Sequence, residues 1–317
     1  QPARGRSLLV KTVLLAGGTG GAKLAAGLQA EIGSDLTVIV NTGDDVEILG
    51  VYVSPDPDLV TYWLTGEIDE TRGWGIKDDG FEVFQRMARF GAPDWFSLSN
   101  LDLAACLYRR DFLAEGGRLT VAQEQIARGL GAQATVLPMS DEPVRTRIMS
   151  SGSWRGLQEY LIIEGGQTAV EGVELQGIAE ASPTPEIAAA LGEAELIVIG
   201  PSNPVISIGP ILAVPGMREM ISAASAPVLA VSPYVAGKVI KGPTDLFMQA
   251  IERPTTAAGV ASLYQGLIEA MICDADDPDP PPPDVRSFST QTLMHSKESR
   301  ASVGRAVLNV GRKLISE

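Results

Sequence analysis

A short apolar run that ends in four clustered glycines constrains the fold of this chain more than any other feature. Residues 13–16 read Val-Leu-Leu-Ala, residues 17–21 read Gly-Gly-Thr-Gly-Gly, and a segment typical of a helix follows at 22–30. We predict a buried strand, a tight turn and a helix, because glycine tolerates positive φ and lets other atoms approach the backbone closely. The N–H groups at the start of such a helix attract anions, so the pattern indicates a phosphate site near residue 20.

The glycine cluster matches neither of the two strict phosphate-binding fingerprints. A P-loop requires Gly-Lys-Ser/Thr where this chain has Ala22, Lys23 and Leu24, and a dinucleotide loop has its last glycine where Lys23 stands. Lys23 could add positive charge to the site if its side chain turns back. A strand-to-helix turn that binds no ligand therefore remains an alternative.

Acidic residues follow the next predicted strand, at residues 36–40. Asn41 begins a segment that ends in Asp44 and Asp45, and the proline-rich segment 54–58 contains Asp56 and Asp58. Open α/β sheets bind ligands at the carboxyl ends of their strands, so these carboxylates are expected beside the glycine cluster. Hard cations such as Mg²⁺ bind through carboxylate oxygens and phosphate oxygens together. The alternatives are a turn or helix cap at Asp45, with Asp44 solvated, and a helix start at Asp58.

Apolar strands and helical segments continue to alternate along the chain, which predicts an α/β fold with a Rossmann-like, doubly wound and mostly parallel sheet. Further strands are expected at 134–137, 196–199 and 228–231, each followed by a polar, proline-containing loop. We expect a helical insert over 71–130, a hairpin region over 145–176 with a strand at 160–163, and a closing helix at 300–314. The predicted division is a disordered lead at 1–7, a nucleotide-binding core at 8–70 and 190–317, and an insert at 71–189.

Charge and cysteine content exclude several classes of function. The net charge of the 317 residues is −14, which argues against nucleic-acid binding, because phosphate repulsion would act over a wide surface. Cys106 and Cys273 are far apart in the sequence, so neither a disulfide framework nor a zinc cluster is expected. We find no signal peptide or membrane span and expect a cytoplasmic protein. His295, the single histidine, is expected at the surface, and contact with substrate is the alternative.

Several longer blocks carry a resemblance to a known family. They are residues 13–24, 41–45, 54–58, the Arg-Gly-Trp-Gly block at 72–75, the Pro-Met-Ser-Asp-Glu-Pro block at 138–143, and residues 200–210, which begin Gly-Pro-Ser-Asn-Pro. In this order the chain resembles the 2-phospho-L-lactate transferase family of coenzyme F420 biosynthesis, which includes phosphoenolpyruvate transferases. The similarity extends from about residue 13 to residue 294.

The resemblance implies a phosphotransferase reaction. Members transfer a phospholactyl- or phosphoenolpyruvyl-type group from a guanosine diphosphate-linked donor to the ribityl hydroxyl of the deazaflavin Fo and release GMP, with Mg²⁺ as cofactor. It also implies a homodimer and an insert that shapes the acceptor side. Asp44 and Asp58 would be the catalytic and metal-binding carboxylates. The other expected contacts with substrate or metal are Gly17, Gly18, Thr19, Gly20, Gly21, Lys23, Asn41, Asp45, Asp56, Arg72, Trp74, Ser140, Asp141, Ser202, Asn203 and Ser207, of which Trp74 is alternatively a core residue.

One block departs from the family pattern. Where the family has Leu-Gly-Asp-Arg-Asp-Leu-Ala-Thr-His, residues 98–106 of this chain have Leu101 in place of the arginine and Cys106 in place of the histidine. An apolar side chain cannot replace a guanidinium that clamps an anion or a carbonyl. We therefore expect this chain to hold its acceptor differently or to use another acceptor.

Two alternatives come from other functional classes. A related branch contains regulatory proteins that bind nucleotide sugars without transfer activity, but this chain lacks that branch's glycine- and serine-rich extension and reads Val-Glu-Ile-Leu-Gly at 46–50. An NAD(P) oxidoreductase rests on fold analogy alone. Which three-carbon acid is carried, phospholactate, phosphoenolpyruvate or 3-phosphoglycerate, stays open, because such analogues differ by one small group.

Overall fold

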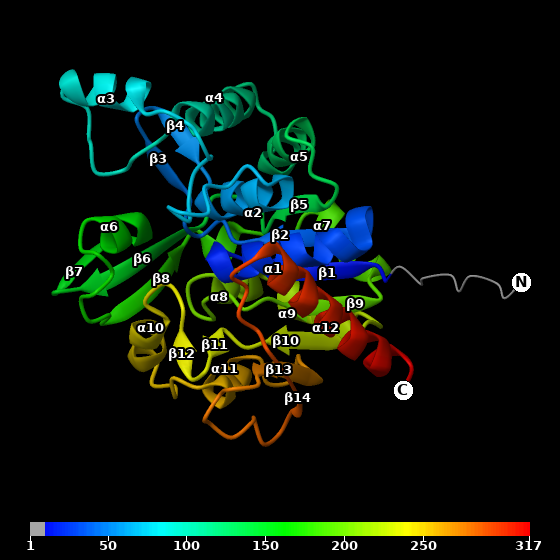
Figure 1. Cartoon of the computed structure of the whole chain (residues 1–317). Helices are drawn as coiled ribbons and strands as arrows, with labels where there is room; N and C mark the ends of the chain where they lie inside the picture. Colours follow the sequence, from blue (N-terminus) through cyan, green and yellow to red (C-terminus); the bar gives the residue numbers. More distant parts are fainter. Residues whose placement is uncertain (1–9) are drawn as a thin grey trace, which may run out of the picture.

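Seven parallel strands form the centre of the protein. The computed structural model describes residues 10–317, so the lead expected at 1–7 lies outside the described residues. The strand order is β14-β13-β10-β9-β1-β2-β5, and every pairing in this sheet is parallel (Figure 1). The strands are β1 (Thr12–Ala16), β2 (Leu36–Val40), β5 (Thr135–Pro138), β9 (Leu196–Ile199), β10 (Val228–Val231), β13 (Ala270–Asp274) and β14 (Arg286–Thr290). The predicted α/β architecture is confirmed, and β13 and β14 extend the sheet beyond the five strands that the sequence indicated.

The order of the strands fixes where a ligand can bind. From β1 the chain first builds outward through β2 and β5, and it then returns to the other side of β1 with β9, β10 and β13. The direction of winding therefore changes between β1 and β9. At such a switch point the loops leave in opposite directions and open a crevice at the carboxyl ends of the strands. The glycine cluster after β1 and the loop at 200–204 after β9 both begin there.

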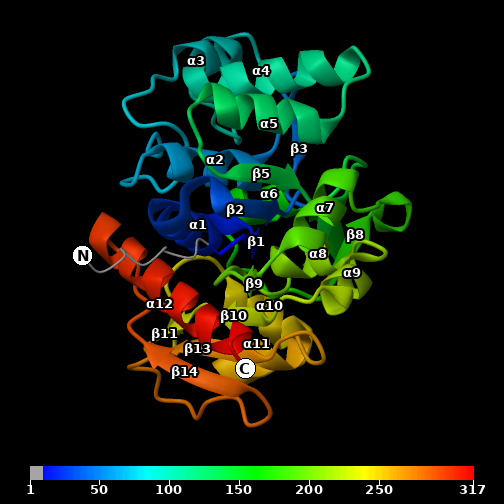
Figure 2. The ribbon, with the colours of Figure 1, turned by 90° about the vertical axis from the view of Figure 1, so that its right-hand side faces the viewer.

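Both faces of the sheet are buried along its inner strands, which explains why these strands are continuous apolar runs, whereas the edge strand β14 is largely exposed. Along β1, Leu14 and Ala16 pack on one face, whereas Val13 and Leu15 pack on the other. Helices cover both faces in Figures 1 and 2. The first face is covered by α1 (Gly18–Ile32), α2 (Pro55–Thr65) and α12 (Lys297–Ile315). The second is covered by α7 (Pro185–Glu193), α8 (Ile208–Ala213), α9 (Met217–Ala223), α10 (Thr244–Ala250) and α11 (Ala257–Leu263).

The predicted helical region over 71–130 is confirmed. It contains α3 (Glu82–Arg89), α4 (Asn100–Ala114) and α5 (Leu119–Gly129), which lie beyond the β5 edge of the sheet (Figure 2). The strand that follows, β5, pairs with β2 in the central sheet. The expected insert at 71–189 therefore consists of two separate parts, a helical one before β5 and a β-rich one after it.

The second inserted part is an antiparallel sheet of three strands. Its strands are β6 (Arg145–Ser150), β7 (Ser153–Gly156) and β8 (Gly172–Gln176), in the order β7-β6-β8. The strand expected at 160–163 is wrong, because this segment belongs to helix α6 (Leu157–Ile162). Leu157 and Tyr160 lie one helical turn apart, and both pack against Phe247 of α10 in one apolar cluster. A short apolar run does not distinguish a buried helix from a strand.

Short elements complete the described chain. Two small hairpins are β3 (Val46–Ile48) with β4 (Val51–Val53), and β11 (Tyr234–Val235) with β12 (Lys238–Val239). Two 3₁₀ turns are η1 (Gly33–Asp35) and η2 (Ile178–Glu180). None of the helices formed by residues 10–317 has both the length and the apolar character needed to cross a bilayer.

Candidate active site

The glycine cluster packs the β1–α1 turn tightly against the loop after β9. Helix α1 starts at Gly18 rather than at residue 22, so most of the cluster forms the first turn of the helix. A Cβ atom at Gly20 would lie 2.1 Å from the carbonyl oxygen of Pro201, and one at Gly21 would lie 2.4 Å from Oγ of Ser202. The backbone of Gly17 donates a hydrogen bond of 3.2 Å to that same Ser202 oxygen. The glycines are therefore needed for this packing as well as for any close approach of a ligand.

Asp56 occupies part of the helix N-terminus that the sequence assigns to an anion. Its Oδ1 accepts a 2.6 Å bond from the backbone N–H of Gly18, and its Oδ2 accepts a 2.9 Å bond from Nδ2 of Asn41. Burial raises the pKa of Asp56 to about 6, although these two hydrogen bonds act in the opposite direction. The N–H groups of Thr19 and Gly20 belong to the same first turn, where a helix provides no internal partner.

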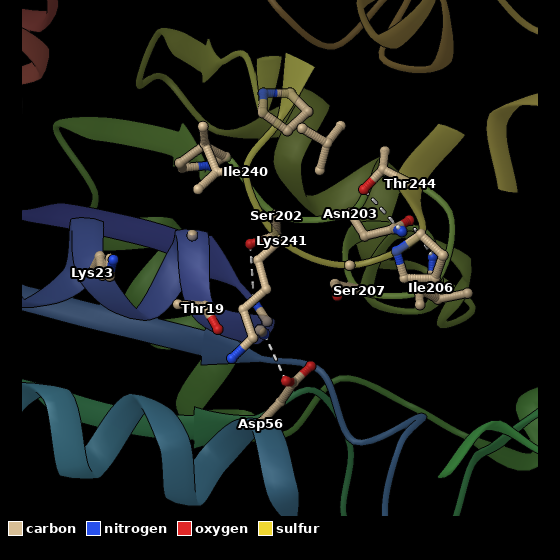
Figure 3. A pocket seen from close by; sticks show the side chains of 18 of the residues that line it. Thr19, Lys23, Asp56, Ser202, Asn203, Ile206, Ser207, Ile240, Lys241 and Thr244 are labelled. Carbon is tan, nitrogen blue, oxygen red and sulfur yellow. Dashed lines mark hydrogen bonds between the residues drawn. The ribbon is translucent and has the colours of Figure 1, made fainter. Parts of the chain in front are cut away.

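A cavity of about 480 Å³ opens in front of this turn (Figure 3). Eleven of the residues predicted to contact substrate or metal line it, namely Gly17, Gly18, Thr19, Gly20, Lys23, Asn41, Asp44, Asp56, Ser202, Asn203 and Ser207. They come from four segments that follow β1, β2, β4 and β9. The structure thus brings most of the predicted contacts together, as the crevice at the strand switch requires.

Asp44 is the most unusual carboxylate in this cavity. It is 7 % exposed, its Oδ1 has no hydrogen-bond partner, and its Oδ2 accepts a 3.3 Å bond from Nε2 of Gln158. Burial and the neighbouring charges of Asp56 and Asp45 raise the pKa of Asp44 well above its usual range. Buried carboxylates without a nearby cation are costly, so this arrangement fits a hard metal ion such as Mg²⁺. The alternative of a solvated Asp44 is wrong.

Asp44 also lines a second cavity of about 450 Å³, which lies between the β3 hairpin and the three-stranded sheet. Asp45, Trp95, Arg145 and Arg147 line this cavity too. Asp45 accepts 2.7 Å bonds from the hydroxyl groups of Tyr52 and Ser54, so its side chain caps no helix. Burial raises the pKa of Asp45 to about 7, against the opposing effect of Arg145.

Asp58 lies elsewhere, and its expected place beside Asp44 at one metal site is corrected. It follows Asp56 by two positions in α2, so its side chain leaves the helix on a different side. Asp58 is 3 % exposed, forms an ion pair with the fully buried Arg109 and lines neither cavity. Asp102 and Cys106 of α4 lie close by, with one ligand atom from each of the three residues within 4.8 Å of the others. Asp56 takes the position beside Asp44 that was expected of Asp58.

Five other predicted contacts do not line either cavity. Arg72 stacks on Trp74 and Phe81, with its guanidinium carbon 5.3 and 5.2 Å from the ring centres, and Trp74 is 41 % exposed rather than a core residue. Ser140 binds the side chain of Glu142, and Asp141 accepts bonds from Arg118 and from the backbone of Thr120. The loop after β5 therefore supports neighbouring loops, and its polar residues are used internally. Gly21 is buried beneath the first turn of α1.

Sequence reasoning missed a second group of residues that line the first cavity. Lys241 and Thr244 follow the β11–β12 hairpin, and Thr292 and His295 follow β14. His295, which was expected merely at the surface, is exposed but lies at the cavity. The lysine had a signal in the sequence, because it stands beside Gly242 in a loop that follows the strand β10. The 292–295 segment had none, since β14 was not predicted.

Comparisons with known proteins identify the family of this chain. The model of the family 2-phospho-L-lactate transferase CofD matches residues 12–307. A 2-phospho-L-lactate transferase of Methanopyrus kandleri is 36% identical over 310 residues, which cover 96% of this chain and 99% of the relative. A phosphoenolpyruvate transferase of Streptomyces coelicolor is 38% identical over 277 residues, which cover 85% of this chain and 87% of the relative.

Solved structures support the fold alone. A crystal structure of a UPF0052 family protein from Bacillus halodurans superimposes with a TM-score of 0.62 at 19% identity, covering 94% of this chain and 98% of that one. The similarity in sequence to the transferases extends over nearly the whole chain and includes the segments that build the first cavity. The chain therefore belongs to the 2-phospho-L-lactate transferase CofD family and is an enzyme of that transferase class.

Proposed function

We propose that this enzyme transfers a phospholactyl- or phosphoenolpyruvyl-type group from a guanosine diphosphate-linked donor to the ribityl hydroxyl of Fo, releasing GMP, in coenzyme F420 biosynthesis. The observation that carries the proposal is the pair of buried carboxylates, Asp44 and Asp56, at a cavity that also contains the glycine turn. Relatives of both names, 2-phospho-L-lactate transferase and phosphoenolpyruvate transferase, match the chain, which supports a three-carbon phosphoacid as the transferred group.

The proposed reaction requires charge neutralisation more than covalent catalysis. The acceptor hydroxyl attacks the phosphorus that carries the three-carbon acid, and a new O–P bond forms. The bond from this phosphorus to the bridging oxygen breaks, GMP leaves with that oxygen, and the hydroxyl proton passes to water. Asp44 and Asp56 would hold Mg²⁺, which supplies positive charge for the diphosphate oxygens. The N–H groups of Thr19 and Gly20, in the first turn of α1 at the same cavity, would add partial positive charge.

The composition of the first cavity supports a nucleotide donor. Lys23 and Lys241 provide positive charge on the α1 side, and apolar side chains such as Leu161 and Ile206 provide surface for a flat ring. Asn203 fixes the loop after β9, because its Oδ1 accepts hydrogen bonds from the backbone N–H groups of Val205 and Ile206. Polar groups at one end and apolar walls at the other are typical of small-molecule sites.

The second cavity supports an acceptor that approaches from the other side of Asp44. Because Asp44 lines both cavities, it is the carboxylate in place to orient an acceptor hydroxyl toward the donor. Trp95 offers an aromatic face, and Arg145 and Arg147 offer donors for ring carbonyls. None of these side chains belongs to the altered block at 98–106, so this route is compatible with the change to Leu101.

A homodimer stays part of the proposal. Large apolar side chains are exposed on the helical part. Val83 of α3 is 46 % exposed, and Phe90 at the end of that helix is 76 % exposed. On α4, Leu101 is 57 % and Leu107 is 50 % exposed. Apolar side chains gathered on one exposed part of a protein often mark an interface. Sedimentation at several protein concentrations tests this point independently of activity.

The reaction is tested by incubating the purified protein with Fo, Mg²⁺ and a guanylylated phospholactate or enolpyruvate donor, and by separating GMP and the modified deazaflavin chromatographically. We expect both products to form together, to disappear with a chelator, and to be lost in Asp44→Asn. The matched control is Asp284→Asn, which removes an exposed carboxylate far along the chain. GMP release without a deazaflavin product would refute the Fo step, and no product from any donor would favour a regulatory nucleotide-binding role.

A further inference from the structure

Lys241 crosses the first cavity and ends on a backbone oxygen. Its ammonium group donates a 3.1 Å hydrogen bond to the carbonyl of Gly73, in the Arg-Gly-Trp-Gly block before α3. In Figure 3 the side chain extends from the loop before α10 in the direction of Thr19 and Asp56. Gly73 has a φ of +74°, and a Cβ atom there would lie 2.7 Å from the lysine nitrogen.

The positive charge of Lys241 has no acidic partner. Within residues 10–317, no carboxylate lies within ion-pair distance of either Lys241 or Lys23, although both lysines line the cavity. Burial lowers the pKa of Lys23 most, the charge of Arg300 lowers it and that of Glu70 raises it, and the charge of Lys241 adds a smaller lowering, so the two lysines repel each other. Two like charges at one cavity that form no ion pair are stabilised by an anion that binds between them.

The segment that carries Lys241 can move. Its base is fixed, because Asp274 accepts a bond from the backbone of Ala236 and Tyr234 donates one to Asp245. Beyond β12, in the part of the chain that the structure describes, the bond to Gly73 is the one hydrogen bond made by residues 240–242. Gly237 and Gly242, at φ of +73° and +84°, stand on either side of Lys241. Glycines in this conformation are well suited to act as hinges.

We propose that Lys241 is a diphosphate-binding residue whose ammonium group leaves the Gly73 carbonyl and binds the phosphate oxygens of a nucleoside diphosphate ligand. The inference deepens the proposed function, on which its choice of ligand rests. A carbonyl offers a neutral acceptor, whereas a phosphate offers charged oxygens, and hydrogen bonds between charged groups are about twice as strong. The ammonium group of Lys241 is therefore expected to bind phosphate in preference to the Gly73 carbonyl. This change of partner draws residues 240–242 toward the α1 side of the cavity.

The test is a calorimetric titration of the full chain with GDP, with Mg²⁺ present, for the wild type and for Lys241→Met. Loss of a charge-assisted contact is expected to weaken GDP binding roughly tenfold or more. Lys238→Met is the matched control, because Lys238 lies in the same hairpin, is exposed and does not line the cavity. Lys241→Arg keeps the charge and should restore most of the affinity. Thermal unfolding of each variant establishes that it is folded.

Two further titrations separate phosphate binding from a structural tie. With guanosine as the probe, Lys241→Met should bind as the wild type does, and the loss should be larger for GDP than for GMP. Equal GDP affinity in wild type and Lys241→Met, an equal loss for guanosine, or no GDP binding by the wild type would each overturn the inference. Failure of the transfer assay with the GDP effect intact would instead reject the proposed reaction and leave the role of Lys241 standing.

Discussion

Two carboxylates in the first turn of α2 have opposite surroundings, although they are two residues apart. Asp56 faces the first cavity and binds the start of α1, whereas Asp58 faces the protein interior and pairs with Arg109. Residues at positions i and i+2 of a helix do not share a face. The motif Pro-Asp-Pro-Asp therefore places one carboxylate at the cavity and another between α2 and α4.

The two surroundings differ in how charge is compensated. Around Asp58, Arg109 also donates to Gln123 and to the carbonyl of Tyr52, and Tyr62 donates a 2.7 Å bond to Asp102. Around Asp44 and Asp56, no cationic side chain of the described chain forms an ion pair with either carboxylate. A site that lacks compensation within the chain is the one suited to a bound cation, and a compensated site is suited to holding helices together.

The largest effect is expected from Asp56→Asn. We predict a fall in transfer rate of roughly 10³-fold, because the substitution removes half of the charge that would hold Mg²⁺ beside the diphosphate. An amide oxygen still accepts the bond from Gly18, but the amide nitrogen cannot accept the bond from Asn41, so the variant should stay folded with a moderately lower melting temperature. Product formation and thermal unfolding, measured on the same preparation, check both statements. A normal rate would place the metal elsewhere.

The second effect is on stability and comes from the interior network. Arg109→Met leaves Asp58 buried without its partner, and breaking a buried ion pair from one side costs about 3–5 kcal/mol. We predict a loss of that size in the free energy of unfolding, measured with urea. The control is Arg110→Met, on the exposed side of the same helix. Equal stability of the two variants would contradict the assignment of Asp58 and Arg109 to a structural role.

A pH dependence sharpens the comparison further. Burial raises the pKa of Asp102 to about 7, and the charge of Asp58 adds to this effect. The folded state therefore holds the proton more tightly than the unfolded state, and the stability that this proton contributes is lost as the pH rises from about 4 to about 7. The wild type should lose roughly 1–3 kcal/mol relative to Asp102→Asn over this range. Urea unfolding at pH 4.5, 6 and 7.5 measures the free energy of unfolding of both proteins. The same change with pH in the wild type and in Asp102→Asn would contradict this prediction.

The smallest effect is expected at Leu101, where the family has arginine. The side chain is 57 % exposed, so Leu101→Arg should change stability by less than about 0.5 kcal/mol. If Fo binds through the second cavity, the affinity of Leu101→Arg for Fo, measured by fluorescence titration, should also stay within about twofold of the wild-type value. A large gain in Fo affinity would show that the acceptor contacts α4 and not the second cavity.

Part of the fold and part of the site follow directly from local sequence. The sheet around β1 was predictable, because apolar runs that end in glycine or in polar and proline residues indicate buried parallel strands. The place of the glycine cluster, Asn41 and Ser202 at one crevice followed from the same pattern. These features depend on local sequence and on the rules that connect parallel strands.

Features that depend on tertiary packing were not predictable. The sequence does not show that Asp56, rather than Asp58, faces the cavity, because Arg109 lies far along the chain and contacts only one of them. The segment at 160–163 is helical because Tyr160 packs against Phe247, a contact between distant segments. The strand β10 and the short hairpin after it bring the chain to the cavity, where Lys241 lies. Only the folded structure shows the contact of Lys241 with Gly73.

The most direct test of this division is metal binding by Asp56→Asn and Asp58→Asn, titrated with Mn²⁺ as a probe for Mg²⁺ and followed by electron paramagnetic resonance. Circular dichroism at low temperature first establishes that both variants are folded. We predict that Asp58→Asn binds Mn²⁺ as the wild type does and unfolds more easily, whereas Asp56→Asn is less destabilised and loses the metal. Loss of Mn²⁺ binding in Asp58→Asn, with binding intact in Asp56→Asn, would contradict the assignment of the two carboxylates.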